Sequence, residues 1–110
     1  MGPKTIEFEN AFRAYIDSQF AISVNSATAA LHLALNAVGV EKDDEVIIPS
    51  PGYGSYDQAV EMANGKIIKL KLTEKNDFAI RAEELEKVIT EKTKIFCLIN
   101  PSNPTGAINP

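Results

Sequence analysis

Apolar and polar positions follow two alternating periods along this chain of 110 residues. Segments in which apolar residues recur three and four positions apart predict helices, and short apolar runs or strict alternations predict strands. The predicted helices are residues 8–16, 26–38, 55–63 and 81–89, and the predicted strands are residues 20–24, 45–49, 66–72 and 95–99. Because helix and strand alternate with short connections, the pattern predicts an α/β fold: three layers, α/β/α, around a mainly parallel sheet of about four strands.

The ends of the predicted helices carry recognisable signals. Thr5 and Ser55 stand where an N-cap hydroxyl is favoured, before the first and the third helix. Gly39 stands where the second helix needs a residue that tolerates the left-handed conformation. The fourth helix, residues 81–89, is expected to turn its apolar side chains inward.

The predicted strands differ in their surroundings. Lysines alternate with apolar residues along strand 66–72, which indicates one wet face and a position at the edge of the sheet. Strand 95–99 is apolar on both faces, which indicates the sheet interior. Strand 20–24 is short and apolar, and we expect it to be buried.

Three loops follow these strands at the edge where parallel sheets bind ligands: residues 25–28, 49–54 and 100–106. The first loop opens a helix with small side chains, so backbone N–H groups and the hydroxyls of Ser26 and Thr28 could hold a phosphate. The same residues would also serve as a simple N-cap on a tightly packed helix. Both interpretations stay open on the local sequence alone.

The other two loops carry groups suited to a planar ligand. Tyr53 follows a Pro-Gly turn, where its ring could cover another ring. Residues 100–106 read Asn-Pro-Ser-Asn-Pro-Thr-Gly, rigid at two prolines, and Asn103 offers an amide to a ligand oxygen. A plain turn rarely needs that much rigidity, so this loop favours a function.

Composition narrows the classes of function. With 11 basic and 15 acidic residues the net charge is −4, and no basic face runs along the chain, so we expect no nucleic-acid partner. The apolar stretches are too short for a membrane helix, and the single cysteine, Cys97, suits a reducing compartment. We therefore expect a soluble, cytoplasmic protein without a membrane partner.

Other polar residues have simpler interpretations than a site. His32 has no ligand-type neighbour at metal-binding spacing, so no metal centre is expected. The acidic residues between Glu41 and Glu45 are most simply a solvated turn before a strand. Cys97 has apolar neighbours and is expected to be unreactive.

The three loops together resemble a known family. Residues 100–106 look like the Asn-Pro-Thr-Gly signature of the aspartate-aminotransferase-like class of fold-type I enzymes that depend on pyridoxal 5′-phosphate (PLP), and residues 51–56 are similar to a loop of that class. Residues 8–15, 25–32 and 44–47 resemble instead the DegT-like sugar-nucleotide aminotransferases. The resemblance implies that residues 1–110 form the N-terminal part of a PLP-transferase large domain, with a possible mosaic seam near residues 49–51.

This resemblance implies a role for each candidate residue. Ser26, Ala27 and Thr28 would hold the cofactor phosphate. Tyr53 would stack on the pyridine ring, and Asn103 would bind the ring 3′-oxygen. In the family, three further residues lie beyond the matched loops: the lysine that bonds to the cofactor, the aspartate that pairs with the pyridine nitrogen, and the arginine that binds the substrate. None of the nine lysines here matches that lysine. We therefore expect a cofactor-binding fragment that is inactive alone; the alternatives are a structural or engineered chimeric fragment without ligand, or a non-catalytic phosphate- or PLP-binding module.

The resemblance also bears on assembly. In the family, the strand that matches residues 20–24 lies across the sheet from the other three. Here it must either close up beside strand 95–99 or leave an apolar edge for another chain. We expect a homo-oligomer formed through that exposed sheet edge.

Overall fold

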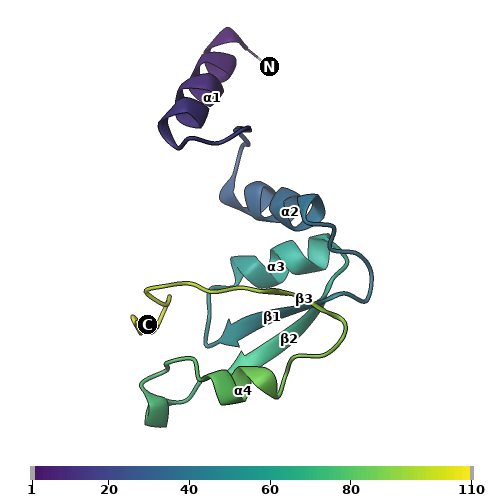
Figure 1. Cartoon of the computed structure of the whole chain (residues 1–110), viewed down its shortest axis with the longest axis vertical. Coiled ribbons are helices and arrows are strands. Elements are labelled where there is room, and N and C mark those ends of the chain that lie inside the picture. Colours follow the sequence, from purple (N-terminus) through teal and green to yellow (C-terminus); the bar gives the residue numbers. More distant parts are fainter. Residues whose placement is uncertain (1, 110) are drawn as a thin grey trace.

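Three parallel strands make up one sheet, in the spatial order β2-β1-β3. The computed structural model describes residues 2–109, with β1 at Glu45–Ser50, β2 at Lys66–Lys71 and β3 at Thr93–Phe96. β1 pairs in parallel with both neighbours. The α/β class is therefore as predicted, with three strands in place of about four (Figure 1).

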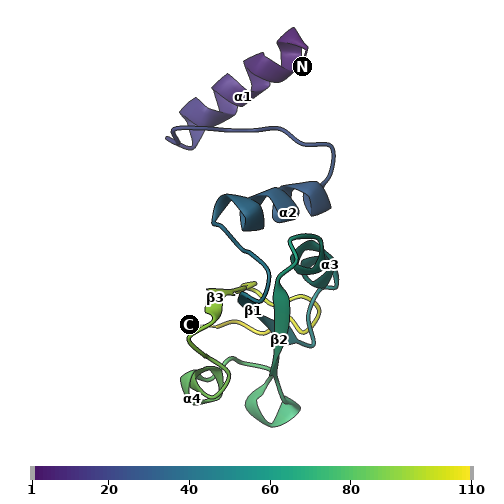
Figure 2. The same ribbon diagram turned by 90° about the vertical axis from the view of Figure 1, so that its right-hand side faces the viewer.

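Helices cover both faces of the sheet. α2 (Ala27–Ala37) and α3 (Ser55–Met62) lie over one face, and α4 (Ala82–Glu86) lies against the other, after the short 3-10 helix η1 (Glu74–Asn76) (Figure 1). The three predicted layers are thus present. α1 (Pro3–Tyr15) lies beyond α2, away from the sheet, in both Figure 1 and Figure 2. Within residues 2–109, every helix falls short of the length and apolar character that a bilayer crossing demands.

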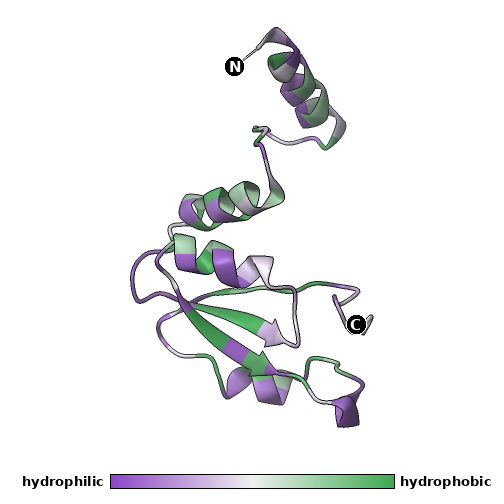
Figure 3. Cartoon of the chain, turned by 180° about the vertical axis from the view of Figure 1, so that it is seen from behind, coloured by the Kyte–Doolittle hydropathy of each residue, from purple (hydrophilic) through white to green (hydrophobic). Residues whose placement is uncertain are grey.

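The core centres on β1, which is buried on both faces. Val46 and Ile48 pack toward α2 and α3, together with Val60, whereas Ile47 packs with Leu70 toward α4. This two-sided burial explains the continuous apolar run of the strand, which β-branched residues fill well. Figure 3 shows the same concentration of apolar residues along β1 and the apolar positions of β2.

The predicted strand at residues 20–24 is wrong. The segment is extended but pairs with nothing within the described residues, and the side chains of Phe20 and Ile22 are 78% and 75% exposed. α2 lies between this segment and the sheet, so it cannot reach the β3 edge within one chain (Figure 2). A strand needs a neighbour for its backbone groups, and apolar residues alone did not provide one.

The predicted interior position of strand 95–99 is also wrong. β3 covers Thr93–Phe96, forms one edge of the sheet, and leaves Leu98 more than half exposed. Its two apolar faces reflect the helices above and below it, not a second neighbouring strand. β2 lies at the other edge, as its lysines predicted.

Three helix ends differ from their predicted positions. α1 begins at Pro3 with Gly2 as its N-cap, because proline suits the first helical turn, and Thr5 lies inside the helix. α3 is capped by Gly54, so Ser55 is its first residue. α4 is much shorter than the predicted helix, residues 81–89. Its apolar side chains do not all turn inward, because Ala82 and Ile89, the latter beyond the end of the helix, are exposed. Gly39, with φ of +75°, follows the end of α2 as predicted.

Candidate functional site

The predicted ligand loops lie on one side of the molecule. The carboxyl end of β1, the first turns of α2 and α3, and the loop after β3 lie on the same side, the left of Figure 1. Parallel strands with connecting helices bring these ends together whatever the side chains are. Residues 25–28 reach that side through α2, although no strand precedes them.

The first turn of α2 offers free backbone donors. The Ser26 hydroxyl accepts from Ala29 N at 3.1 Å, and the Ser26 carbonyl accepts from Ala30 N at 3.1 Å. Within residues 2–109, the N–H groups of Ala27 and Thr28 have no acceptor. The prediction of an N-cap and the prediction of an anion site are therefore compatible, because Ser26 satisfies one amide and two others stay free.

The second loop is built around a tight turn that places Tyr53. A Cβ atom on Gly52 would collide with the Pro49 carbonyl oxygen, so only glycine fits there. Tyr53 is half exposed, and its ring lies 6.4 Å from that of Tyr56 with planes 76° apart. This edge-to-face pair steadies Tyr53 while leaving aromatic surface in solvent.

The third loop is fixed by its own hydrogen bonds. Ser102 N donates to the Ala107 carbonyl, and Gly106 N donates to the Ser102 carbonyl, both at 2.8 Å, with Gly106 at a φ of +72°. Asn103 is exposed at the tip, where its amide faces solvent. The rigidity expected from the prolines is thus reinforced by a turn that requires glycine at its end.

Two asparagines anchor this loop to the core. The Asn100 side chain donates to the Asn109 carbonyl at 2.7 Å and accepts from Asn109 N at 2.9 Å. The buried Asn109 side chain in turn accepts from Ile80 N at 2.8 Å. Sequence reasoning missed Asn109, because nothing around it distinguishes it from an exposed loop asparagine. Its role depends on a contact with a residue 29 positions away.

The five predicted site residues share a side but do not form a closed pocket. Among the described residues, no hydrogen bond connects the three loops, and each of the five is exposed or half-buried. The five are Ser26, Ala27, Thr28, Tyr53 and Asn103. The arrangement is an open surface that presents amide donors, an aromatic ring and a carboxamide to solvent.

The sequence suggested that the acidic residues between Glu41 and Glu45 form a solvated turn. This interpretation is wrong for Glu45. Glu45 is 4% exposed, and its carboxylate accepts from the Thr90 hydroxyl at 2.6 Å and from Lys66 Nζ at 2.9 Å. These hydrogen bonds, with Thr90 first, lower the pKa of Glu45. Because Glu45 begins β1, at the end opposite the loops, it ties the starts of β2 and β3 together and takes no part in the candidate site.

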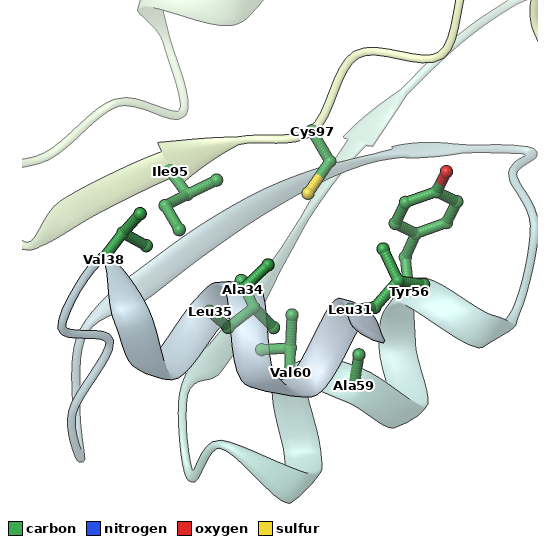
Figure 4. Close-up of a pocket in the computed structure, with 9 residues that line it drawn as sticks. All are labelled: Leu31, Ala34, Leu35, Val38, Tyr56, Ala59, Val60, Ile95 and Cys97. Atoms are coloured by element: carbon green, nitrogen blue, oxygen red, sulfur yellow. The ribbon is translucent and has the colours of Figure 1, made fainter. Parts of the chain in front are cut away.

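Cys97 lies against an apolar cavity. Its sulfur points into a space of about 210 Å³ between α2, α3 and β3, near Leu35 and Ile95 (Figure 4). Burial raises the pKa of this thiol, which disfavours the reactive thiolate. No three His, Cys, Asp or Glu side chains in residues 2–109 are arranged to hold a metal ion.

Comparisons with known proteins match both halves of the resemblance. The model of the DegT/DnrJ/EryC1/StrS aminotransferase family matches residues 1–102. An uncharacterized protein of Methanocaldococcus jannaschii is 43% identical over 94 residues, which is 86% of this chain and 24% of that protein. The aspartate aminotransferase of Bacillus subtilis is 39% identical over 94 residues, 86% of this chain and 23% of that enzyme.

The fold of the chain is also similar to that of a solved structure. A putative sugar aminotransferase from Streptococcus pneumoniae, in its PLP form, superposes with a TM-score of 0.75 at 33% identity, covering 87% of this chain and 24% of that one. The chain thus spans about a quarter of the length of these relatives. Aminotransferases of this type use PLP. Because the family model matches residues 1–102 and the fold agrees with that of a solved aminotransferase, the chain belongs to the DegT/DnrJ/EryC1/StrS aminotransferase family.

Proposed function

We propose that residues 1–110 form the part of an aminotransferase that holds PLP, with the first turn of α2 as the phosphate anchor. The observation that carries this proposal is the pair of free N–H groups on Ala27 and Thr28. Free amides at a helix N-terminus bind anions, and the helix dipole adds favourable potential there. The Thr28 hydroxyl and the small Ala27 side chain suit a close approach by phosphate oxygens.

The other two loops orient the ring. Tyr53 has aromatic surface free to lie against the pyridine ring, supported by its contact with Tyr56. Asn103 has an amide at the tip of a fixed loop, able to donate to the ring 3′-oxygen. Asn100 and Asn109 position Asn103 indirectly, because their hydrogen bonds to each other fix the base of the loop.

When bound, PLP supplies the electron sink for amino-group transfer, whereas the residues of this chain bind and orient it. We infer from the resemblance that none of the nine lysines here is the counterpart of the family's cofactor-bonding lysine. We therefore propose that residues 1–110 alone do not transfer amino groups. Measurable transamination of any amino acid by the purified 110-residue chain would overturn this part of the proposal.

Equilibrium dialysis of PLP against the purified chain tests the binding. We expect saturable binding that Thr28→Val weakens by roughly ten- to a hundredfold, since one charge-assisted hydrogen bond contributes about 1.5–3 kcal/mol. Thr5→Val is the matched control, because Thr5 lies within α1, outside the proposed site. Inorganic phosphate should compete with PLP if the first turn of α2 is the anchor.

Borohydride trapping with peptide mapping distinguishes this site from chance reaction with lysines. Adducts scattered over surface lysines, without a saturable component in dialysis, would contradict the proposal. That result would favour the structural-fragment alternative, which the exposure of Asn103 and the lack of hydrogen bonds between the loops support.

A further inference from the structure

The sequence contains a single Asn-Gly pair, Asn64-Gly65. Of the eight asparagines, three precede proline, which has no N–H, and four precede a residue that has a Cβ atom. The side chain of an asparagine can react with the backbone nitrogen of the next residue, and glycine leaves that approach open because it has no Cβ. Asn64 is therefore the asparagine whose local sequence most favours loss of the side-chain amide group.

This reaction, deamidation, consumes only water. The Gly65 nitrogen gives up its proton and bonds to the side-chain carbon Cγ of Asn64. The bond between Cγ and Nδ2 breaks, and Nδ2 leaves as ammonia with that proton, so a five-membered succinimide ring remains. Water then opens the ring at one of its two carbonyl groups, which yields aspartate or isoaspartate. No oxidant or reductant takes part.

The pair forms the turn between α3 and β2 (Figure 1). Asn64 N donates to the Glu61 carbonyl oxygen at 3.0 Å. Gly65 N donates to the Val60 carbonyl oxygen, also at 3.0 Å. With Asn64 at a φ of +59°, these two bonds make up the Schellman motif that ends many helices. The nitrogen that must attack is thus bonded to the helix as long as the motif is intact.

Packing holds Gly65 as well. A Cβ atom on Gly65 would lie 3.0 Å from Val40 Cγ1 and 3.1 Å from Val60 Cγ1, and both valines belong to the core. The side chain of Asn64, in contrast, is exposed to water. One reacting group is therefore fixed against the core, and the other is free in solvent.

We propose that Asn64 is a site of spontaneous deamidation and that the Schellman turn at the end of α3 controls its rate. While the turn is closed, the Gly65 nitrogen is directed at the Val60 carbonyl oxygen and is held back from Asn64 Cγ. Opening of the last turn of α3 frees this nitrogen, and the ends of helices open at a lower cost than the whole fold. The contacts that close the turn lie within residues 40–66, and the proposal does not depend on PLP binding.

The product would weaken the same turn. Aspartate or isoaspartate adds negative charge at the C-terminus of α3, where the helix dipole favours cations. Isoaspartate also adds a carbon atom to the main chain just before Lys66, whose N–H donates to the Asp44 carbonyl oxygen at 2.8 Å as β2 begins. One event would therefore change both the charge at the end of α3 and the connection from α3 to β2.

The first test incubates the full 110-residue chain at mildly alkaline pH and follows deamidation by peptide mapping with mass spectrometry. In concentrated guanidinium chloride we expect Asn64 to react before the other seven asparagines. In the folded chain Asn64 should react at least about tenfold more slowly, because the turn must open first. Another asparagine reacting first in guanidinium chloride, or equal rates at Asn64 in the two states, would overturn the proposal.

Two variants at Met62 test the control by the turn. Met62 is the last residue of α3 and is half exposed, so substitutions there leave the core in place. Met62→Gly should speed deamidation of the folded chain about fivefold, because glycine weakens the last helical turn. Met62→Ala is the matched control and should leave the rate near that of the unaltered chain. In guanidinium chloride all three chains should react alike, since Met62 takes no part in the chemistry.

Hydrogen exchange at the Gly65 amide separates the turn from other causes. The nitrogen that exchanges its proton is the one that attacks, so Met62→Gly should accelerate exchange and deamidation by the same factor. Faster exchange without faster deamidation would mean that closure of the turn does not limit the reaction. Faster deamidation without faster exchange would mean that Met62→Gly acts elsewhere. Either result would contradict the proposal.

Discussion

Residues 40–72 and the N-terminal arm, residues 3–24, are both rich in apolar residues, but they differ in how far those residues are buried. The first segment forms β1, α3 and β2 and supplies most of the buried core, whereas the arm buries no side chain of its helix. The difference is backbone pairing. β1 has a strand on each side and helices on each face, and the arm has a single neighbour, α2, that covers it loosely. Apolar content sets what a segment can bury, and the presence of partners decides whether it does.

The largest expected effect is a core truncation. Ile47→Ala should destabilise the fold by about 2–5 kcal/mol, because Ile47 is fully buried between β2 and α4. Phe12→Ala in the arm should stay within about 0.5 kcal/mol in the monomer. Urea unfolding of both variants at low concentration measures the contrast. Equal costs would mean that the arm packs into the core in solution.

The anchor of the third loop comes next. Asn109→Ala removes the acceptor of the Ile80 N–H and should cost about 1–3 kcal/mol, with faster hydrogen exchange at the Ile80 amide. Asn103→Ala is the control, since that side chain is exposed at the loop tip. If Asn103→Ala destabilises the protein as much, the loop is held in a different way.

A smaller effect is expected at the cap of α2. Ser26→Ala should cost about 1 kcal/mol, and Ser26→Gly only a few tenths, because the hydroxyl accepts from Ala29 N. Ser55→Ala should be nearly neutral, since Gly54 is the N-cap of α3. Thermal unfolding ranks the three variants. A larger loss at Ser55 than at Ser26 would reverse the assignment of caps.

The smallest expected effects are on the pH dependence of unfolding, to which a carboxylate of the core and one of the arm contribute differently. The pKa of Glu45 is lowered by the Thr90 hydroxyl and Lys66, so its stabilisation is present above the unfolded pKa of about 4.3 and is lost as pH falls through the lower folded value. Thr90→Val should reduce the urea midpoint at pH 7, and the difference should shrink toward pH 3.

Glu9 gives the matched comparison in the arm. Hydrogen bonds from Ser23 N and the Ser23 hydroxyl lower the pKa of Glu9, so protonation weakens its hold on Ser23. Because α1 buries no side chain in the core, Glu9→Gln should leave the pH dependence of core unfolding unchanged. A shift of that dependence as large as the one from Thr90→Val would couple the arm to the core.

Patterns within a segment predicted most of the helices and strands, but they did not predict the contacts between segments. The lysines of β2 marked an edge because alternation alone carries that information. Residues 20–24 have the composition of a strand, yet no local signal tells whether a neighbour is available. Glu45 resembled its solvated neighbours, because its partner Thr90 lies 45 positions away.

Residue chemistry and strand order predicted where the candidate site lies, and the resemblance supplied the role of each residue. Local sequence left residues 26–28 open between a cap and an anion site, and the structure shows that Ser26 caps while two amides stay free. The roles of Tyr53 and Asn103 stay predictions. So does the assignment of residues 1–110 to one partial large domain with a seam near residues 49–51.

The most direct test of the central claim is a titration of the ¹⁵N-labelled chain with PLP, followed by amide NMR. We expect saturable shifts at the Ala27 and Thr28 amides and at the Asn103 side-chain amide, with inorganic phosphate moving the first two alone. Shifts confined to residues around surface lysines, with Ala27 and Thr28 unmoved, would contradict it.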